Sequence, residues 1–285
     1  MNQKIIGLTG LFFLVAALLV APLGARAELY VEGYIGGVQA TNMGEKFTVH
    51  ESGPNALSDF QLKHDGKSDP AVIGGLKIGT WFVKEGFLGM NYPDWMKYFG
   101  FYTDFSYHRL AFRGQKVTGS DILLRNGVQF GAFSQGALSA DDGMVATWAF
   151  MFAARYGFLR DSEVPFGRLQ PYLAVGPAVL FTSMNPKVRV DTFGVPGSGT
   201  IANDLATGGA SQSATTIALA VDAGIRYLAL KNVSLDLSFK YRYAQPHFEF
   251  SGSNREVNGV AVPVSYKLDP TYHLLSGQMG AAYHF

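Results

Sequence analysis

Three residue types found in hydrolytic enzymes stand at alternate positions of the sequence, as Asp104, Ser106 and His108. On a β-strand, alternate residues share one face and lie about 7 Å apart. That separation is too long for the direct hydrogen bond by which a histidine activates a serine nucleophile. The spacing therefore assigns no catalytic residue, and we expect the protein not to be an enzyme.

The sequence motifs that usually hold metals or cofactors are also missing. The sequence has no cysteine, its six histidines are scattered, and Asp141-Asp142-Gly143 does not follow the calcium-loop pattern. Neither a phosphate-binding loop nor a dinucleotide fingerprint occurs. We expect no metal and no cofactor.

Nine charged residues stand within segments that are otherwise apolar or built from small residues. They are Glu32, Lys77, Asp104, Arg155, Asp222, Arg226, Asp236, Lys240 and Arg242. If they share an enclosed interior they must pair or keep water, because an isolated buried ion costs several kcal/mol. Glu32 and Lys77 should lie at similar heights on neighbouring strands. We favour an ion-paired plug over the alternative, a polar path for solutes.

The segments that carry these charges alternate large apolar residues with small or polar ones. Eight such segments occur, at residues 29–35, 75–82, 99–108, 146–155, 169–181, 217–227, 233–243 and 275–285. Alternation with period two indicates half-buried β-strands. Large apolar side chains on one face, with glycine, alanine, serine or a charge on the other, are typical of a barrel whose outer face meets lipid. We therefore predict an all-β fold, an eight-stranded antiparallel up-and-down transmembrane barrel.

The composition agrees with this fold class. The chain has 285 residues, of which 48% are hydrophobic and 14% aromatic, and its formal net charge is +1. Ample apolar content and low charge argue against a disordered chain, and the near-neutral balance gives no basic footprint for nucleic acid.

Residues 1–27 have the features of a cleaved signal peptide. Lys4 precedes an apolar run at residues 5–20, and Ala25-Arg26-Ala27 forms an A-x-A cleavage signal before Glu28. The run is shorter than the roughly 20 residues that a spanning helix needs. We predict export of the protein, with one barrel domain over residues 28–285.

The connections between the eight segments alternate in length. Three are short, at residues 83–96, 157–167 and 228–231, and four are long, polar and loop-like, at residues 40–71, 110–143, 183–213 and 248–269. Short periplasmic turns and long external loops are the asymmetry of outer-membrane barrels. We expect four long surface loops, with both mature termini on the periplasmic side.

Aromatic residues should form a girdle at each membrane interface, because their rings favour that depth. The predicted periplasmic set is Tyr30, Trp81, Phe82, Tyr98, Phe99, Tyr156, Tyr227, Tyr283 and Phe285, and the predicted outer set is Phe105, Tyr107, Trp148, Phe181, Tyr241 and Tyr243.

Two segments resemble those of a known family, the small eight-stranded outer-membrane barrels of the OmpA-like and Opa-like type. Residues 168–176, Arg-Leu-Gln-Pro-Tyr-Leu-Ala-Val-Gly, are similar to the Pro-Tyr-x-x-x-Gly strand common in that family. Met279, Ala281, Tyr283 and Phe285 are similar to the terminal signal that the barrel-assembly machinery reads. The resemblance implies the outer membrane of a Gram-negative-type cell envelope, with that machinery as a partner.

Three hypotheses for function follow. The favoured one is a non-enzymatic barrel with a structural or surface-interaction role, whose extracellular loops engage lipopolysaccharide, other outer-membrane lipid, or matrix and host ligands. Lys187 and Arg189 in the third loop suit a solvated face or lipopolysaccharide phosphates. The alternative is a narrow channel for small solutes or ions. The third is a lipid-modifying enzyme, which the resemblance suggests and for which His273 and Thr271 would be the lipid-facing candidates.

Overall fold

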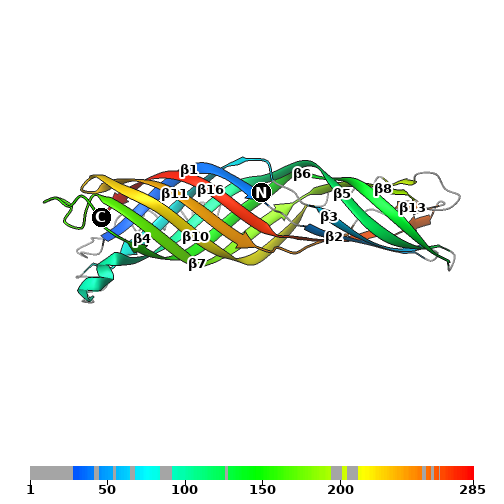
Figure 1. The fold of residues 1–285 in the computed structure, drawn as a ribbon, viewed down its shortest axis with the longest axis horizontal. Coiled ribbons are helices and arrows are strands. Elements are labelled where there is room, and N and C mark those ends of the chain that lie inside the picture. The colour runs from blue at the N-terminus through cyan, green and yellow to red at the C-terminus, as the bar shows by residue number, and fades with distance from the viewer. Residues whose placement is uncertain are drawn as a thin grey trace, which may run out of the picture.

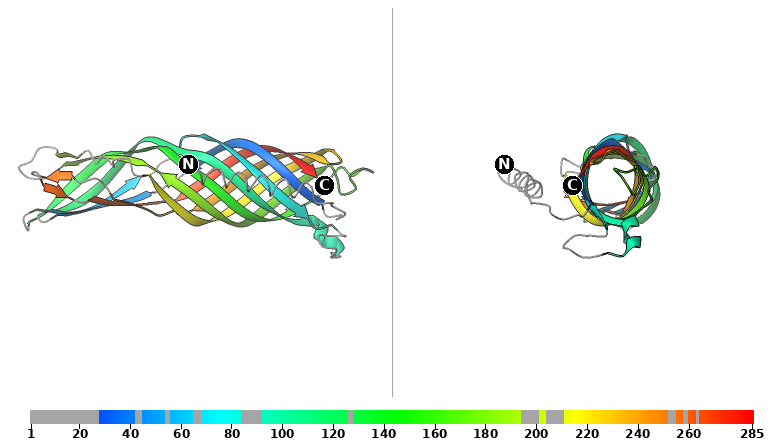
Figure 2. Two further views of the ribbon diagram at one scale, coloured as in Figure 1. Left: turned by 180° about the vertical axis from the view of Figure 1, so that it is seen from behind. Right: turned by 90° about the vertical axis from the view of Figure 1, so that its left-hand side faces the viewer.

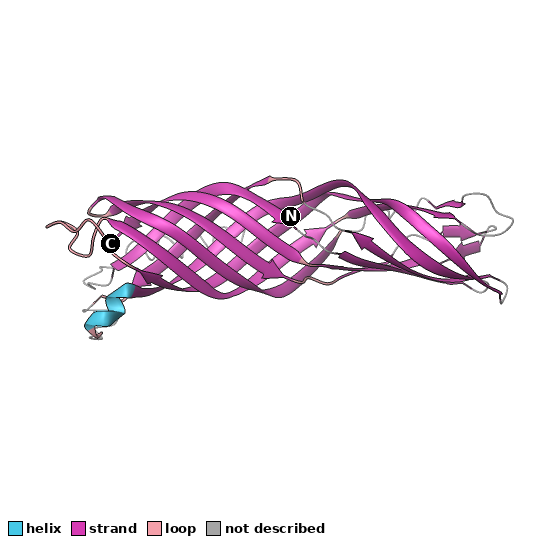
Figure 3. Cartoon of the chain, viewed as in Figure 1, coloured by secondary structure: helices cyan, strands magenta, loops and turns pink. Residues whose placement is uncertain are grey.

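The chain forms a long, continuous β-structure in the computed structural model, which describes residues 28–41, 45–53, 56–64, 68–83, 92–125, 128–193, 201–203, 211–251, 255–257, 260–262 and 264–285. Strands make up nearly all of it (Figures 1 and 3). Within these residues no helix is both long and apolar enough to span a bilayer. The predicted signal peptide, residues 1–27, lies outside the described residues and stays a prediction.

Eight strands close into a barrel. They are β1 (Glu28–Thr41), β4 (Ala71–Trp81), β5 (Phe99–Arg125), β6 (Val128–Arg155), β7 (Leu169–Met184), β10 (Gln212–Leu230), β11 (Val233–Ala244) and β16 (Tyr272–His284). Each pairs antiparallel with its sequence neighbour in this set, and β1 pairs with β16 to close the ring. Figure 2 shows the ring viewed end-on. The predicted eight-stranded antiparallel barrel is confirmed.

The register fixes how strongly the strands tilt. Following paired residues once around the ring from Leu29 leads back to β1 at Gln39, a shift of ten residues. A shift of this kind requires strands inclined by about 35–45° to the barrel axis. At this strand number the interior has room for side chains and little more.

The outer wall of the barrel is apolar around its circumference. Large side chains that face outward include Ile35, Phe152, Leu237, Phe239 and Met279, all more than half exposed. A soluble protein would not leave so large an apolar surface open to water. Lipid is the environment that suits this wall, as period-two alternation predicts.

The barrel sheet continues beyond one end of the barrel, which corrects the expectation of four loop-like connections. The additional strands are β2 (Glu45–Gly53), β3 (Ala56–His64), β8 (Pro186–Phe193), β9 (Ile201–Asn203), β12 (Phe248–Ser251) and β15 (Val264–Pro270). Together with the far halves of β5 and β6 they follow the order β12-β15-β2-β3-β5-β6-β8-β9, which we call the extension. A separate ladder joins β13 (Arg255–Val257) to β14 (Val260–Val262).

The physical reason for this error is that alternation of apolar and polar residues arises where one face of a strand contacts lipid, whereas backbone pairing does not require it. Beyond the bilayer both faces of a strand can be polar, so the hydrophobic pattern fades while the hydrogen-bonded ladder continues. The β5–β6 ladder runs as far as Arg125 and Val128, with register shifts near Phe112.

The opposite end of the barrel carries the short connections. The β10–β11 turn, the β6–β7 connection and the paired ends of β1 and β16 all lie there, since Tyr30 pairs with His284. The segment before β5 includes a short 3-10 helix, η2 (Asp94–Tyr98), at the same end (Figure 3). We call this the turn end.

Two aromatic residues assigned to the periplasmic girdle point into the barrel. Tyr30 and Trp81 are 1% and 3% exposed, and their rings stack at a centroid distance of 6.4 Å. Both occupy inward positions of the alternation, and inside the barrel each ring faces a guanidinium, Arg226 over Tyr30 and Arg155 over Trp81. By contrast Tyr283 and Tyr156 do face outward.

Candidate functional site

The interior half nearest the turn end is filled by charged side chains. All nine charged residues singled out from the sequence are inward-facing and buried, and Arg242 lies nearest the extension, as the cross-strand partner of Leu274. Glu28 joins them, because its carboxylate pairs with Arg155 at 2.5 Å. The described interior thus holds five carboxylates and five Lys or Arg cations. Sequence reasoning placed Glu28 only at the cleavage site, although it shares the inward face of Glu32.

Lys77 is the centre of this cluster. Its Nζ lies 2.9 Å from Glu32 Oε1, 3.4 Å from Asp222 Oδ2 and 3.7 Å from Asp236 Oδ1. The backbone register sets the first contact, because Glu32 and Lys77 are direct cross-strand partners on β1 and β4. Arg226 closes the group by pairing with Glu32 at 2.5 Å and Asp236 at 3.4 Å. One cation therefore compensates three buried carboxylates, with a second cation sharing two of them.

Interior tyrosines donate hydrogen bonds to three of the interior carboxylates. Tyr34 donates to Asp104 at 2.6 Å, Tyr102 to Asp222 at 2.8 Å and Tyr172 to Asp236 at 2.8 Å. The Lys77 ammonium also lies 5.3–5.8 Å from the centroids of these three rings. The inward alternation contains these tyrosines, but sequence reasoning read only the charges.

Asp104, Ser106 and His108 share one inward face but have separate partners. Asp104 pairs with Lys240. Ser106 accepts a hydrogen bond from Arg242 at 3.3 Å, and His108 Nδ1 contacts the Arg109 carbonyl at 2.9 Å. Among the described residues no hydrogen bond joins Ser106 to His108, so the arrangement is not that of a hydrolytic triad.

An apolar layer, which was not predicted, lies above Lys77 toward the extension. It is formed by Val38, Ile73, Leu110, Val145, Leu180 and Leu274, none of them more than 4% exposed. It also encloses the buried polar side chains of His108, Thr147 and Arg242, which are the cross-strand partners of Ile73, Leu180 and Leu274. Met184, Tyr272, Phe248 and Leu268 are buried in the same hydrophobic cluster and continue it to the base of the extension. These residues stand at inward positions of their strands, so extending the alternation toward the loops would have found them.

Polar side chains beside the outer end of the wall bond to each other. His273 Nδ1 and the Tyr241 hydroxyl share a hydrogen bond of 2.8 Å. The His273 ring also packs edge-on against Tyr243 at a centroid distance of 5.3 Å. The imidazole of the histidine proposed for lipid chemistry is therefore held by two tyrosines, Tyr241 and Tyr243.

The family-like segment at residues 168–176 anchors the turn end. Arg168 pairs with Asp161 and, at 2.6 Å, with Glu163, and donates to the Leu228 carbonyl of the next turn at 3.2 Å. The hydrogen bond from Arg168 lowers the pKa of Asp161. Asp161 also accepts from the Val164 amide, which closes the turn.

A histidine of the extension predicts a pH-dependent contact. His247 bonds to Asp269 in β15 and lies 3.4 Å from Glu249 in β12, and these two carboxylates raise its pKa. Because the folded-state pKa is raised, the contact stabilises fully below the ordinary histidine pKa and is lost as pH rises through the folded value. NMR titration of His247 should give a midpoint above the usual 6.5, and Asp269→Asn should lower that midpoint. An equal midpoint in both proteins would contradict this assignment.

The side chains of Lys187 and Arg189, the basic cluster of the predicted third loop, lie outside the described residues. Only the backbone of these two residues, in β8, is described. Among side chains that are placed, no group of three or more His, Asp or Glu is arranged to hold a metal. Met279, Ala281 and Tyr283 face outward on β16, and the Phe285 amide donates to the Leu29 carbonyl at 2.9 Å.

Comparison with known proteins bears on the fold. No protein-family model and no curated protein matches the sequence. Solved structures similar to the chain include Neisserial surface protein A (13% identity, TM-score 0.43, covering 90% of this chain and 97% of that one) and OprG from Pseudomonas aeruginosa (12%, 0.41, 92% and 99%). Another is Ail of Yersinia pestis (13%, 0.33, 87% and 99%). The eight-stranded barrel fold that the resemblance implies is confirmed by the closed strand register.

Proposed function

We propose that the protein is a sealed, non-enzymatic outer-membrane barrel that carries a rigid β-extension into the cell's surroundings as an interaction platform. The observation that carries this proposal is the filling of the interior. An ion-paired cluster occupies the half near the turn end, and the apolar layer, together with the buried side chains of Arg242, His108 and Thr147, occupies the half near the extension. The barrel then serves as an anchor, and the extension presents the surface on which partners act.

The filled interior is the main argument against the channel hypothesis. Toward the extension, Ile73, Leu180 and Leu274 are 0% exposed, and their cross-strand partners His108, Thr147 and Arg242 are buried beside them. Side chains that fill the interior of an eight-stranded barrel in this way leave little room for a hydrated ion. The charged cluster nearer the turn end is a second barrier, since Lys77, Arg226 and Lys240 are held by ion pairs.

The length of the extension supports a surface role. From Leu110 to Arg125, β5 continues past the barrel interior, and fifteen residues at about 3.3 Å each span roughly 50 Å along the strand. This length is additional to the part of the strand that crosses the roughly 30 Å hydrocarbon layer. In this part β5 pairs with β3 on one side and β6 on the other, so backbone hydrogen bonds support the extension.

We also propose on which side of the membrane each end of the barrel lies and which partners each part meets. The extension faces outward, the turn end and both mature termini face the periplasm, and the chain is exported through cleavage after Ala27. The partners are lipopolysaccharide and other outer-membrane lipid at the wall, the barrel-assembly machinery during insertion, and host or matrix ligands at the extension.

Location and closure predict a distinctive gel behaviour. The protein should fractionate with outer membranes, and unboiled samples should migrate differently from boiled ones, because a closed barrel resists detergent. Protease added to intact cells should cut the extension and spare the barrel. Recovery as a soluble periplasmic protein, or cleavage only after the outer membrane is broken, would contradict the location or the sidedness.

A further inference from the structure

Arg242 is a buried cation without an ionic partner among the described residues. Its side chain is 0% exposed, and its guanidinium makes one hydrogen bond, from Nη2 to Ser106 Oγ at 3.3 Å. The Nε and Nη1 atoms are buried with no hydrogen-bond partner. The other buried cations of the interior each contact at least one carboxylate; they are Lys77, Arg155, Arg226 and Lys240. An ion or a water molecule commonly accounts for buried polar groups that a protein leaves unpaired.

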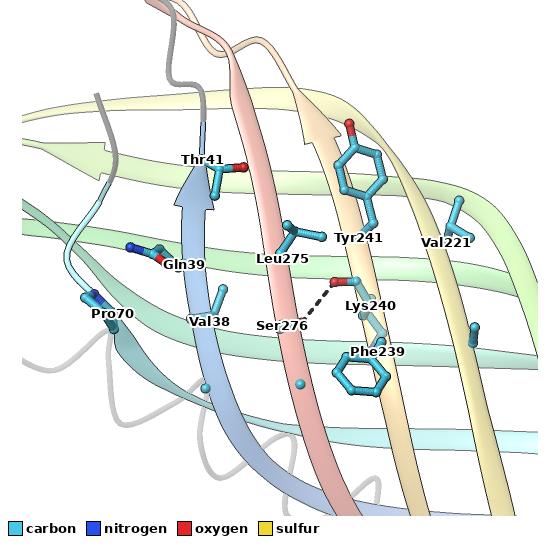
Figure 4. A pocket seen from close by; sticks show the side chains of 13 residues that line it. Val38, Gln39, Thr41, Pro70, Val221, Phe239, Lys240, Tyr241, Leu275 and Ser276 are labelled. Carbon is cyan, nitrogen blue, oxygen red and sulfur yellow. Dashed lines mark hydrogen bonds between the residues drawn. The ribbon is translucent and has the colours of Figure 1, made fainter. Parts of the chain in front are cut away.

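The side chain of Arg242 crosses the barrel interior. Tyr241 lines a hollow on the outer side of the wall, where Figure 4 shows β1, β16 and β11 side by side, so Arg242, the next residue, projects inward. In the ring of eight strands β11 lies opposite β5, with β10, β7 and β6 between them on one side. Because the guanidinium reaches Ser106 on β5, its two unpaired nitrogen atoms lie within the interior and not at the wall.

The strands on this side of Arg242 carry small inward side chains. A row of buried alanines runs from β6 to β11 as successive cross-strand partners; they are Ala149, Ala178, Ala218 and Ala244. The partner of Arg242 itself on β10 is Ala220, which is 0% exposed. Methyl groups occupy little of the interior, so space remains beside the guanidinium. In a barrel of eight strands such a space suits a single small ion and no larger molecule.

Two buried hydroxyl groups near the guanidinium are also without partners. Thr147 on β6 is the direct cross-strand partner of Ser106, and Thr182 stands on the inward face of β7. The Oγ1 atoms of both threonines are buried with no hydrogen-bond partner. Hydroxyl groups can donate, and a guanidinium only donates. Donors that surround a positive charge suit an anion, because charge-assisted hydrogen bonds are stronger than those to a neutral acceptor such as water.

The carboxylates of the interior are bonded without Arg242. Asp104, which stands two residues before Ser106, bonds to Lys240 and to the Tyr34 hydroxyl. The other four carboxylates contact Lys77, Arg155 or Arg226, and the hydroxyls of Tyr102 and Tyr172 donate to two of them. Arg242 is therefore the one cation of the described interior whose charge is not compensated by direct contact.

We propose that the barrel interior holds one small monovalent anion, of the size of chloride, bound between the Arg242 guanidinium and the Thr147 hydroxyl. The anion supplies the charge compensation that no carboxylate gives Arg242, and so it is a structural part of the plug. The buried side chains of Ile73, Leu180 and Leu274 enclose this region. The anion is therefore taken up as the barrel folds and exchanges slowly afterwards.

The test measures the halide that the folded barrel retains. Purified protein is unfolded in urea, refolded in detergent micelles with sodium bromide as the only halide, and passed into a halide-free gluconate buffer. Bromide per folded chain is then measured by elemental mass spectrometry, and heat-dependent gel migration gives the folded fraction. Arg242→Gln removes the cation, and Thr147→Val removes one hydroxyl at nearly constant volume. Arg226→Gln is the matched control, because it removes a buried guanidinium that is paired with Glu32 and Asp236.

We expect about one bromide per folded chain for wild type and Arg226→Gln, and about tenfold less for Arg242→Gln and Thr147→Val, as for the loss of one hydrogen bond to a charged group. If Arg242→Gln does not fold, Thr147→Val alone decides the comparison. In crystals grown with bromide, anomalous scattering should place the ion beside Arg242. Wild type that retains no bromide, equal retention by wild type and Thr147→Val, or only a water molecule beside Arg242 would overturn the proposal.

Discussion

Lys77→Met should destabilise the barrel by about 3–5 kcal/mol, the cost of leaving buried charges without their partner. The substitution removes the ammonium that lies 2.9 Å from Glu32 and 3.4 Å from Asp222, while both carboxylates stay 0% exposed. Reversible urea unfolding in detergent micelles measures the free energy directly. No large pore should open, because the apolar layer lies at a different depth and is untouched.

Lys267→Met is the matched control, since Lys267 pairs with Glu249 at 3.1 Å in the exposed part of the extension. Its effect should stay within about 0.5 kcal/mol, as for most surface pairs. Adding Glu32→Gln to Lys77→Met should recover part of the loss, because one uncompensated carboxylate disappears. If Lys77→Met and Lys267→Met cost the same, the plug is not held together by these ion pairs.

Deleting Phe285 should stop most of the protein from inserting in cells while leaving refolding into pure detergent close to normal. The ring is only partly covered, at 36% exposure, and packs edge-on against Tyr283 at a centroid distance of 5.0 Å. Its burial accounts for about 1–3 kcal/mol at most. A loss of assembly larger than this therefore indicates recognition by the assembly machinery, which is the role that the family resemblance implies.

Phe239→Ala provides the control for lost apolar surface, because this ring is also outward-facing but lies in mid-strand. The inserted fraction in cells, measured by heat-dependent gel migration, should be near wild type for Phe239→Ala and low for the deletion. Equal insertion of wild type and the Phe285 deletion would contradict a recognition role for the terminal residue.

The wall of the barrel was predictable and the ends of its interior were not. Alternation identified outward residues such as Phe105, Leu237 and Met279, because lipid demands large apolar groups there. It also placed Glu32 and Lys77 inside the barrel. The register makes them direct cross-strand partners, and Lys77 Nζ lies 2.9 Å from Glu32 Oε1. Trp81 was assigned to the girdle from its position along the strand alone, although it stands on the same inward face as Lys77.

The apolar layer and the extension escaped prediction for related reasons. Val38 and Leu180 are apolar residues at inward positions, where the alternation pattern predicts small or charged residues. The extension depends on hairpins pairing with each other across long sequence separations, as in β15 with β2. Polar sequence does not distinguish such paired strands from loops, since backbone hydrogen bonds hold them together.

Planar-bilayer conductance of the purified full-length protein tests the central claim, that the interior is sealed, most directly. We expect no steady single-channel current for wild type, and none for Lys77→Met, because Ile73, Leu180 and Leu274, with the buried Arg242 and His108 beside them, still fill the lumen. Replacing Ile73, Leu180 and Leu274 with serine in the Lys77→Met background should produce small, ion-selective openings. Steady wild-type conductance whose ion selectivity changes in Lys77→Met would contradict the sealed barrel and establish a channel.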